Sequence, residues 1–221
     1  AVVGIIYGAL VAWAQEDMKK LVAYSSVSHM GFIMLGIFAM TREGVAGSVL
    51  QMVNHGLSTG ALFLCVGFLY ERRHTRLMRD YGGVARAMPV FAATFVLVSL
   101  SSMGLPGTNG FVGEFLILAG TFKEGIGSVL EPDNLLCWRN QVIVLAVLAT
   151  SGVVLGAVYL LTMLRRVLFG PVKLEENREL KDLSWRERIV ILPIVAFIIL
   201  IGIAPGIFLQ KINRSVDKYV E

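Results

Sequence analysis

The chain has 221 residues, of which 56% are hydrophobic and only 16% are charged, and its formal net charge is +4. Ordinary soluble domains carry about 45–50% apolar and about 25% charged residues, so the composition excludes a soluble enzyme of one or two domains and a disordered tail. The basic residues cluster between apolar runs, which is typical of a membrane protein and excludes a nucleic-acid-binding domain.

Six apolar runs follow one another along the chain, and each is a candidate membrane helix. A bilayer core of about 30 Å needs about 20 apolar residues per helix. The first run is short, as if the chain were a fragment of a longer one, and the other five are long enough to span. The sequence therefore predicts an all-α integral membrane bundle of about six helices. The runs are Ala1–Gln15, Leu21–Thr41, Gly44–Tyr70, Ala87–Phe122, Asn140–Leu164 and Ile189–Gln210.

The loops between these runs alternate in charge, which predicts the orientation of the bundle. Cytoplasmic loops of membrane proteins carry an excess of Lys and Arg. One side has 14 basic residues and the other has 6, so the first side is expected to be cytoplasmic and the C-terminus to lie outside. The basic residues of the first side are Lys19, Lys20, Arg72, Arg73, Arg76, Arg79, Arg86, Arg165, Arg166, Lys173, Arg178, Lys181, Arg186 and Arg188. Those of the other side are Arg42, Lys123, Arg139, Lys211, Arg214 and Lys218.

The second run carries three polar residues on one helix face. Ser25, Ser28 and His29 are spaced i, i+3 and i+4. A histidine near the middle of a membrane helix is costly and usually faces a partner or water, which makes His29 a candidate proton carrier. The alternative is a packing histidine whose ring nitrogens bond to a neighbouring helix.

The third run carries a polar stripe three turns long. One interpretation is a seam of interhelical hydrogen bonds, each worth about 0.6–2 kcal/mol. The other is the wall of a hydrated path in which His55 relays protons, and the two interpretations are compatible. The stripe consists of Gln51, Asn54, His55, Ser58 and Thr59.

The fourth run is too long for one straight span and is interrupted near its middle. The 35 residues from Met88 to Phe122 would extend about 52 Å as one helix. Pro106 removes an amide donor and clashes with the preceding turn, and the glycines around it add backbone freedom. We expect two half-helices joined by an extended loop at mid-membrane, an arrangement that marks ion and substrate sites in transporters. The residues assigned to the break are Gly104, Pro106, Gly107 and Gly110.

Glu114 is the only acidic residue within the six runs. It follows the break by four residues, where the first turn of a half-helix offers unpaired amides and positive dipole charge to a carboxylate. Burial disfavours the charge, so the carboxyl group is expected to bind and release a proton, as a proton carrier must. The alternative is a structural ion pair with a basic residue from elsewhere in the full protein.

Other sequence features predict packing rather than chemistry. The segment Pro171–Arg188 mixes both signs of charge and is expected to form a solvated interfacial helix. Pairs of glycines four residues apart predict close helix packing. These pairs are Gly4 and Gly8, Gly56 and Gly60, and Gly152 and Gly156.

No sequence motif indicates a cofactor or a metal in this chain. Cys65 and Cys137 lie far apart and lack CxxC spacing, which excludes a disulfide framework and an iron–sulfur or other metal site. A dinucleotide-binding fingerprint and a P-loop are also absent. Any electron chemistry is therefore expected to belong to partner subunits.

Four stretches together resemble the proton-pumping M-type (chain 4) subunits of NADH:quinone oxidoreductase, respiratory complex I. They occur in the order of that family, and the similarity runs through essentially the whole chain, which resembles the last six helices of a fourteen-helix protein. The stretches are Ala14–Phe32 (AQEDMKKLVAYSSVSHMGF), Gln51–Phe63 (QMVNHGLSTGALF), Tyr70–Arg76 (YERRHTR) and Leu105–Leu116 (LPGTNGFVGEFL).

The resemblance implies two inverted five-helix repeats, each with one broken helix. Residues 1–169 would form the second repeat, 170–188 a cytoplasmic linker, and 189–221 the last membrane helix with an outside tail. Glu114 matches the acidic residue of the second broken helix, at the head of an outward half-channel, and His29 and His55 match two central-axis histidines. The essential Glu and Lys of the family's first half-channel would lie upstream of Ala1.

The resemblance also implies a function. The chain would be a proton-translocating subunit of an enzyme complex in a bacterial plasma (inner) membrane, with L-type and N-type subunits as neighbours. Partner subunits would hold NADH, FMN, iron–sulfur clusters and quinone, and their electron transfer would drive proton export along the His/Glu path.

Three alternatives stay open at this stage. Relatives on the same scaffold are subunits of cation/proton antiporters and of proton-pumping membrane-bound hydrogenases. L-type, N-type and antiporter chains typically carry Lys where this chain has Glu114, which favours the M type over them but not over a hydrogenase subunit. The third alternative is a structural membrane scaffold whose polar residues only form packing seams.

Overall fold

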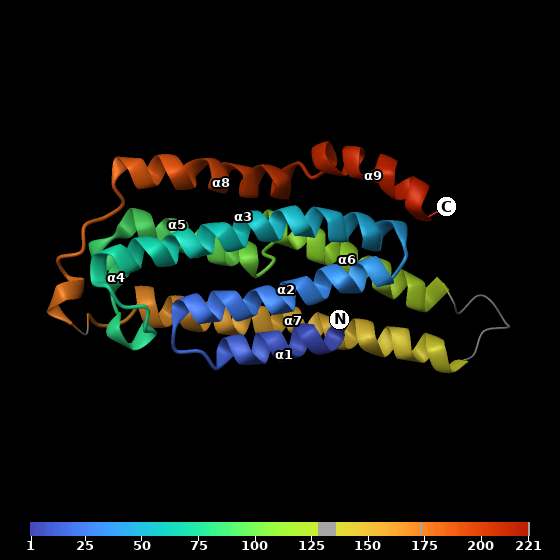
Figure 1. The fold of residues 1–221 in the computed structure, drawn as a ribbon, viewed down its shortest axis with the longest axis horizontal. Helices are drawn as coiled ribbons and strands as arrows, with labels where there is room; N and C mark the ends of the chain where they lie inside the picture. Colours follow the sequence, from blue (N-terminus) through green and yellow to red (C-terminus); the bar gives the residue numbers. More distant parts are fainter. Residues whose placement is uncertain (128–135, 173, 221) are drawn as a thin grey trace.

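The computed structural model describes residues 1–127, 136–172 and 174–220, and every regular element within them is helical (Figure 1). The side chains of residues 127–140 and 220 are outside this description, so the predictions for Cys137, Arg139 and Lys173 fall outside the described residues. The predicted all-α fold is confirmed. The α-helices are α1 (Val2–Trp13), α2 (Met18–Phe38), α3 (Arg42–Arg73), α4 (Val84–Ala87), α5 (Pro89–Ser102), α6 (Asn109–Gly127), α7 (Leu136–Leu168), α8 (Trp185–Ile203) and α9 (Gly206–Val220).

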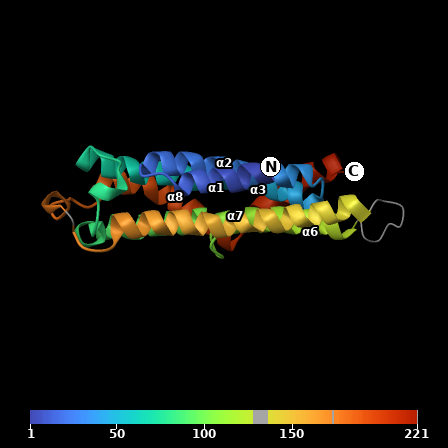
Figure 2. The same cartoon turned by 90° about the horizontal axis from the view of Figure 1, so that it is seen from below.

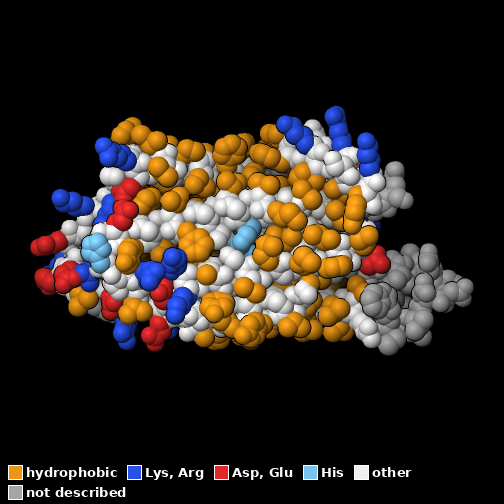
Figure 3. Space-filling view, viewed as in Figure 1, with side chains coloured by type: hydrophobic (Ala, Val, Ile, Leu, Met, Phe, Trp, Pro, Cys, Tyr) orange, Lys and Arg blue, Asp and Glu red, His pale blue; other side chains and the backbone are white. Residues whose placement is uncertain are grey.

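The long helices run along one common axis (Figures 1 and 2). α2 packs between α1 and α3, α6 packs against α3, and α7 packs against α1 and α6. α8 lies along α3 and α6. Figure 3 shows hydrophobic side chains over the middle of the visible face and most charged side chains toward its two ends. This distribution is that of an integral membrane protein.

Local capping contacts explain where the second and third helices begin. The Asp17 side chain accepts hydrogen bonds from the amides of Lys19 (2.8 Å) and Lys20 (3.3 Å), and so caps α2. The Thr41 hydroxyl accepts from the Gly44 amide at 3.1 Å and caps α3. Such caps satisfy amides that have no partner within the helix. Asp17 thus lies in the turn between α1 and α2, and Thr41 lies in the turn between α2 and α3.

Helical structure stops between Ser102, where α5 ends, and Asn109, where α6 begins. Gly104 and Gly107 have φ angles of +75° and +90°, a region that residues with a side chain rarely adopt. Pro106 lies between these two glycines and cannot donate a backbone hydrogen bond. The fourth apolar run is therefore divided into two helices at Gly104, Pro106 and Gly107, whereas Gly110, also assigned to the break, lies in α6.

The last apolar run differs from its prediction. Instead of one helix over Ile189–Gln210, the chain forms α8 and then α9, which is turned by 71° from α8. Pro205 stands at the bend, where it supplies no amide for a continuous helix. α9 places apolar residues such as Val216 against Val45 and Ala46 of α3. The residues predicted as a C-terminal tail thus form an amphipathic helix docked on α3, and their position outside the membrane stays a prediction.

The segment between α7 and α8 also differs from its prediction. It contains only one short 3-10 turn, Glu175–Asn177, and not an interfacial helix. The Arg72 side chain donates to the backbone carbonyls of Lys181 (2.7 Å) and Asp182 (3.2 Å). Carbonyls bound in this way are not available to a local helix. Arg72 also pairs with both carboxylate oxygens of Glu187, each at 2.7 Å, which ties this segment to α3 and α8.

Asp182 in this segment caps α5, and its removal is expected to destabilise the protein. Its carboxylate accepts from the amides of Val90 (2.9 Å) and Phe91 (3.0 Å). Asp182→Ala leaves these amides unpaired and should cost about 1 kcal/mol. Asp217→Ala is the matched control, because Asp217 forms an exposed pair with Arg42 and its loss should cost less than about 0.5 kcal/mol. Thermal unfolding of the detergent-solubilised full-length protein checks the difference, and equal melting temperatures would contradict it.

Three helices in the described part of the chain are long and apolar enough to cross a membrane by themselves: Met18–Phe38, Arg42–Arg73 and Gln141–Leu168. The bent pair α8 and α9 makes up to four. α1 and α5 are apolar but shorter, with 12 and 14 residues. The predicted number of about six spans therefore stays a prediction.

Close packing of small residues occurs at some of the predicted glycines and at others that the spacing did not indicate. A Cβ atom at Gly8 would lie 2.7 Å from the Ser28 amide, and one at Gly152 would overlap Ile5. A Cβ atom at Gly4, Gly56 or Gly60 would meet nothing within 4 Å among the described residues, so no close packing within them occurs there. The glycines that bring α2, α3 and α6 together are Gly36, Gly44, Gly47 and Gly120.

Candidate functional site

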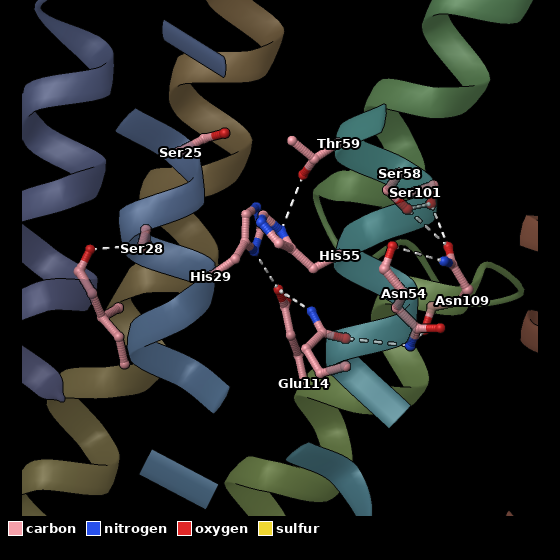
Figure 4. A network of polar contacts seen from close by, with 12 residues as sticks. Ser25, Ser28, His29, Asn54, His55, Ser58, Thr59, Ser101, Asn109 and Glu114 are labelled. Carbon is pink, nitrogen blue, oxygen red and sulfur yellow. Dashed lines mark hydrogen bonds and ion pairs between the residues drawn. The ribbon is translucent and has the colours of Figure 1, made fainter. Parts of the chain in front are cut away.

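His29 of α2 and Glu114 of α6 lie side by side inside the bundle (Figure 4). The His29 Nδ1 atom is 3.0 Å from Glu114 Oε1, and the two side chains are only 8% and 6% exposed. α6 begins at Asn109, so Glu114 lies near the positive end of its helix dipole. The imidazole and the carboxylate can therefore exchange a proton directly, away from bulk water.

The polar stripe of α3 reaches the same carboxylate. Gln51 donates from Nε2 to Glu114 Oε1 at 3.3 Å. Asn54 donates to Gln51 Oε1 at 3.3 Å and to the backbone carbonyl of Asn109 at 2.7 Å. Gln51 thus adds a second hydrogen bond to Glu114 Oε1, and Asn54 connects α3 to the first residue of α6.

Two residues that sequence reasoning missed continue this network. Ser101, near the end of α5, donates to Asn109 Oδ1 at 2.5 Å. Ser58 of α3 contacts both side chains, at 2.8 Å from Ser101 Oγ and 3.2 Å from Asn109 Oδ1. An Asn at the start of a helix, directly after a Gly- and Pro-rich segment, was the available signal for Asn109. No spacing rule indicated Ser101.

His55 is close to His29 but does not bind Glu114. The two imidazole rings have centroids 5.5 Å apart and are tilted by 43°. His55 Nδ1 lies 3.0 Å from the Thr59 hydroxyl, one turn further along α3. The three predicted proton-transfer residues thus lie together in the order His55, His29, Glu114. Thr59 orients His55.

The two predicted serines of α2 do not bind His29 or Glu114, and their hydroxyls donate to backbone carbonyls. The Ser28 hydroxyl donates to the Ile5 carbonyl of α1 at 2.9 Å, and the Ser25 hydroxyl donates to Val22 within α2 at 2.8 Å. In Figure 4 both lie on α2 away from the hydrogen bonds of the α3 stripe. Ser28 forms part of a packing seam between α1 and α2, which is the structural interpretation that the sequence left open.

A small cavity lies between the two histidines and the start of α6. About 10 Å³ of it is open to the centre of a water molecule, which is room for about one water. His29 Nε2 and Asn54 Oδ1 are buried and have no hydrogen-bond partner among the described residues. Both residues line the cavity, so one water there could satisfy both atoms. The complete lining is His29, Gln51, Asn54, His55, Ser58, Ser101, Ser102 and Gly110.

The glycines assigned to the break have different roles in the site. Gly104 packs against the carboxylate, because a Cβ atom there would lie 2.9 Å from Glu114 Oε2. Gly110 lies in α6 and lets that helix approach the Ser101 carbonyl. Gly107 has nothing within 4 Å of a Cβ position in the described part of the chain. Gly104 therefore adjoins the carboxylate, whereas the backbone of Gly107 packs against Gly202 of α8 and its Cβ position is open.

This difference gives a matched pair of variants. Gly104→Ala and Gly107→Ala both place a side chain at positive φ, with a similar backbone cost of about 1 kcal/mol. Only Gly104→Ala also displaces the Glu114 carboxylate. In the full-length protein we expect Gly104→Ala to lower proton translocation at least about fivefold more than Gly107→Ala, measured in vesicles with a pH-sensitive dye. Equal activities of the two variants would show that the contact with Glu114 is unimportant.

No group of three His, Cys, Asp or Glu side chains that could hold a metal ion occurs in the described ranges. The groups that are present, a carboxylate, two imidazoles and several amides and hydroxyls, can bind, pass and orient protons. The fold and this cluster together define the protein as an α-helical integral membrane protein with a buried carboxylate–imidazole pair next to an interrupted helical segment.

Residues 1–130 match the model of the NADH:quinone oxidoreductase/Mrp antiporter transmembrane family, and the chain belongs to this family. It is 45% identical over 99% of its length to the NADH-quinone oxidoreductase subunit M of Rhodobacter capsulatus. It is 41% identical over its whole length to the NADH-ubiquinone oxidoreductase chain 4 of Marchantia polymorpha. The resemblance to M-type subunits that the four sequence stretches indicated is thereby confirmed.

A solved structure agrees with these relatives. The chain superposes on a chain of respiratory complex I from Thermus thermophilus with a TM-score of 0.84 and 34% identity, over 100% of its own length and 43% of that chain. It likewise spans only 40% of the Rhodobacter protein and 41% of the Marchantia protein. The chain therefore corresponds to about two fifths of the length of the relatives that it matches.

Proposed function

We propose that this chain is part of a proton-translocating M-type membrane subunit of an NADH:quinone oxidoreductase. The observation that carries the proposal is the contact between His29 and Glu114, because it joins a buried base to the only carboxylate within the apolar runs. A buried ionisable pair in a membrane protein is costly and marks proton relays. The similarity to subunits named M and chain 4 supports the same assignment.

The proton path that we propose runs from His55 through His29 to Glu114. Protonated His29 gives the proton at Nδ1 to Glu114 Oε1, across the 3.0 Å contact. The neutral imidazole then carries its one hydrogen on Nε2. It returns to the Nδ1–H tautomer before Nε2 accepts the next proton, from His55 or from a water in the adjoining cavity. Glu114 releases its proton toward the outside, and the Gln51 hydrogen bond stabilises the carboxylate that remains. Each transfer depends on the charge of the neighbouring group.

We also propose how the chain lies in the membrane. We propose that α5 and α6 together form one broken span, that the whole chain contributes about six spans, and that residues 1–169 form one five-helix repeat. The loops with the larger number of basic residues would lie in the cytoplasm and the C-terminus outside a bacterial plasma membrane. The first half-channel and its lysine would belong to residues upstream of Ala1.

The partners in this proposal are other membrane subunits of complex I, with L-type and N-type subunits as direct neighbours. NADH, FMN, iron–sulfur clusters and quinone would be bound by partner subunits, and this chain would hold no redox centre. Electron transfer there would change the charge along the polar axis and so drive proton transfer here. The complex as a whole would then be a translocase, and this chain one of its proton-carrying parts.

Co-purification tests this function against its alternatives. The tagged full-length protein is expected to carry NADH:quinone oxidoreductase activity with it, and vesicles containing the complex should show NADH-driven proton movement. Exchange of Na⁺ for H⁺ by the protein without redox partners would instead identify a cation/proton antiporter subunit. This alternative stays open because the matched family is named for both NADH:quinone oxidoreductase and the Mrp antiporter. Hydrogenase activity in the purified complex would instead identify a subunit of a proton-pumping membrane-bound hydrogenase.

A further inference from the structure

Tyr159 of α7 is a buried polar residue that the proton path described above does not use. Its side chain is 1% exposed, and its hydroxyl has no hydrogen-bond partner among the described residues. Phenylalanine would fill the same space without the free-energy cost of burying an unpaired hydroxyl. A hydroxyl in such a place calls for a partner that binds it in some state of the site.

The Tyr159 side chain folds back along its own helix toward the site. Its hydroxyl lies over Gly156, 3.9 Å from where a Cβ of that residue would be, which is an ordinary contact distance. The hydroxyl lies near the Ser25 side chain. α7 contacts α2 and α6 on the side away from α3 (Figure 1). Tyr159 therefore approaches the His29–Glu114 pair from the flank opposite the polar stripe.

Ser25 is suited to accept a hydrogen bond from Tyr159. Its hydroxyl hydrogen is used by the bond to the Val22 carbonyl, at 2.8 Å, which leaves the oxygen lone pairs free. Ser25 is buried, and it precedes His29 by one helical turn on the same face of α2 (Figure 4). A bond from Tyr159 to Ser25 would thus join α7 to the helix that carries His29.

We propose that the Tyr159 hydroxyl and Ser25 form a second hydrogen-bonding arm that positions the His29–Glu114 pair from α7. The inference rests on the proposed function of that pair. Tyr159 acts as a positioning residue: it donates a hydrogen bond to Ser25, directly or through one water, and so fixes the part of α2 that carries His29. It keeps its own proton throughout, so the proton balance of the path is unchanged.

The experiment uses Tyr159→Phe in the full-length protein, assembled in its complex. Two quantities are measured: protons moved per NADH oxidised, and the carboxyl stretching band of Glu114 in the infrared difference spectrum, identified by its absence in Glu114→Gln. We expect Tyr159→Phe to lower the first about fivefold, the factor that one hydrogen bond contributes, and to shift the second. A residue that only fills space would move neither.

Tyr7→Phe is the matched control, since Tyr7 is an exposed residue of α1 and its hydroxyl does not adjoin the pair. It should leave both measurements unchanged. If Tyr159→Phe does not assemble, Ser25→Ala removes the acceptor of the same arm and must shift the same band. A wild-type number of protons moved per NADH and an unshifted band in assembled Tyr159→Phe overturn the inference. Loss of pumping in Glu114→Gln would, in that case, leave the proposed function intact. Normal pumping in Glu114→Gln would overturn the proposed function itself.

Discussion

Replacement of Glu114 by Gln is expected to stop proton translocation while the complex still assembles. Gln has nearly the same shape as Glu and can keep a hydrogen bond with His29 and Gln51, so the packing between α2, α3 and α6 should persist. It cannot bind and release a proton at neutral pH. Removal of a proton-carrying group typically costs a factor of about 100 or more, so NADH-driven acidification should fall to background.

Assembly and transport are measured separately in this experiment. NADH:ferricyanide activity reports that the electron-input partners are present, and the proton yield per NADH reports on translocation. Glu124→Gln is the control, because Glu124 lies on the same helix but is exposed near its far end. It should pump as the wild type does. A wild-type proton yield in Glu114→Gln would refute the role of this carboxylate, whatever the rest of the site does.

The sequence predicted the central chemistry because ionisable residues are rare in apolar helices. Glu114 and His29 stood out without any knowledge of the fold, and the structure places them 3.0 Å apart. The break near Pro106 was predicted for the same kind of reason, since proline and closely spaced glycines act on the local backbone alone. Features that depend on one residue's own chemistry were therefore accessible from the sequence.

The sequence failed where contacts between helices decide the outcome. Ser101 and Asn109 join the network only because α5, α6 and α3 meet in one particular register, which no periodicity encodes. The same is true of the segment before α8, whose carbonyls bind Arg72 across a distance of about 110 residues in the chain. Hydropathy likewise read Ile189–Gln210 as one continuous helix, because a hydropathy average does not register the single Pro205 at which the chain turns.

Replacement of His29 by Gln is expected to lower proton translocation at least about tenfold, and more than replacement of His55. His29 contacts Glu114 directly and also lines the cavity from which it would be recharged. His55 does not bind the carboxylate, and a water in the cavity can in part take over its role. Gln at either position keeps a polar side chain of similar length but cannot carry a proton.

The double variant distinguishes a path from a set of packing contacts. Steps in series fail together, so His29→Gln combined with His55→Gln should pump no less than His29→Gln alone. Packing losses at two separate contacts would instead add, and would appear as lower thermal stability. His74→Gln, at the exposed end of α3, is the control and should have wild-type activity. Unaltered pumping in the double variant would favour a structural scaffold, because the only two imidazoles beside Glu114 in the described part of the chain would then be dispensable for proton transfer.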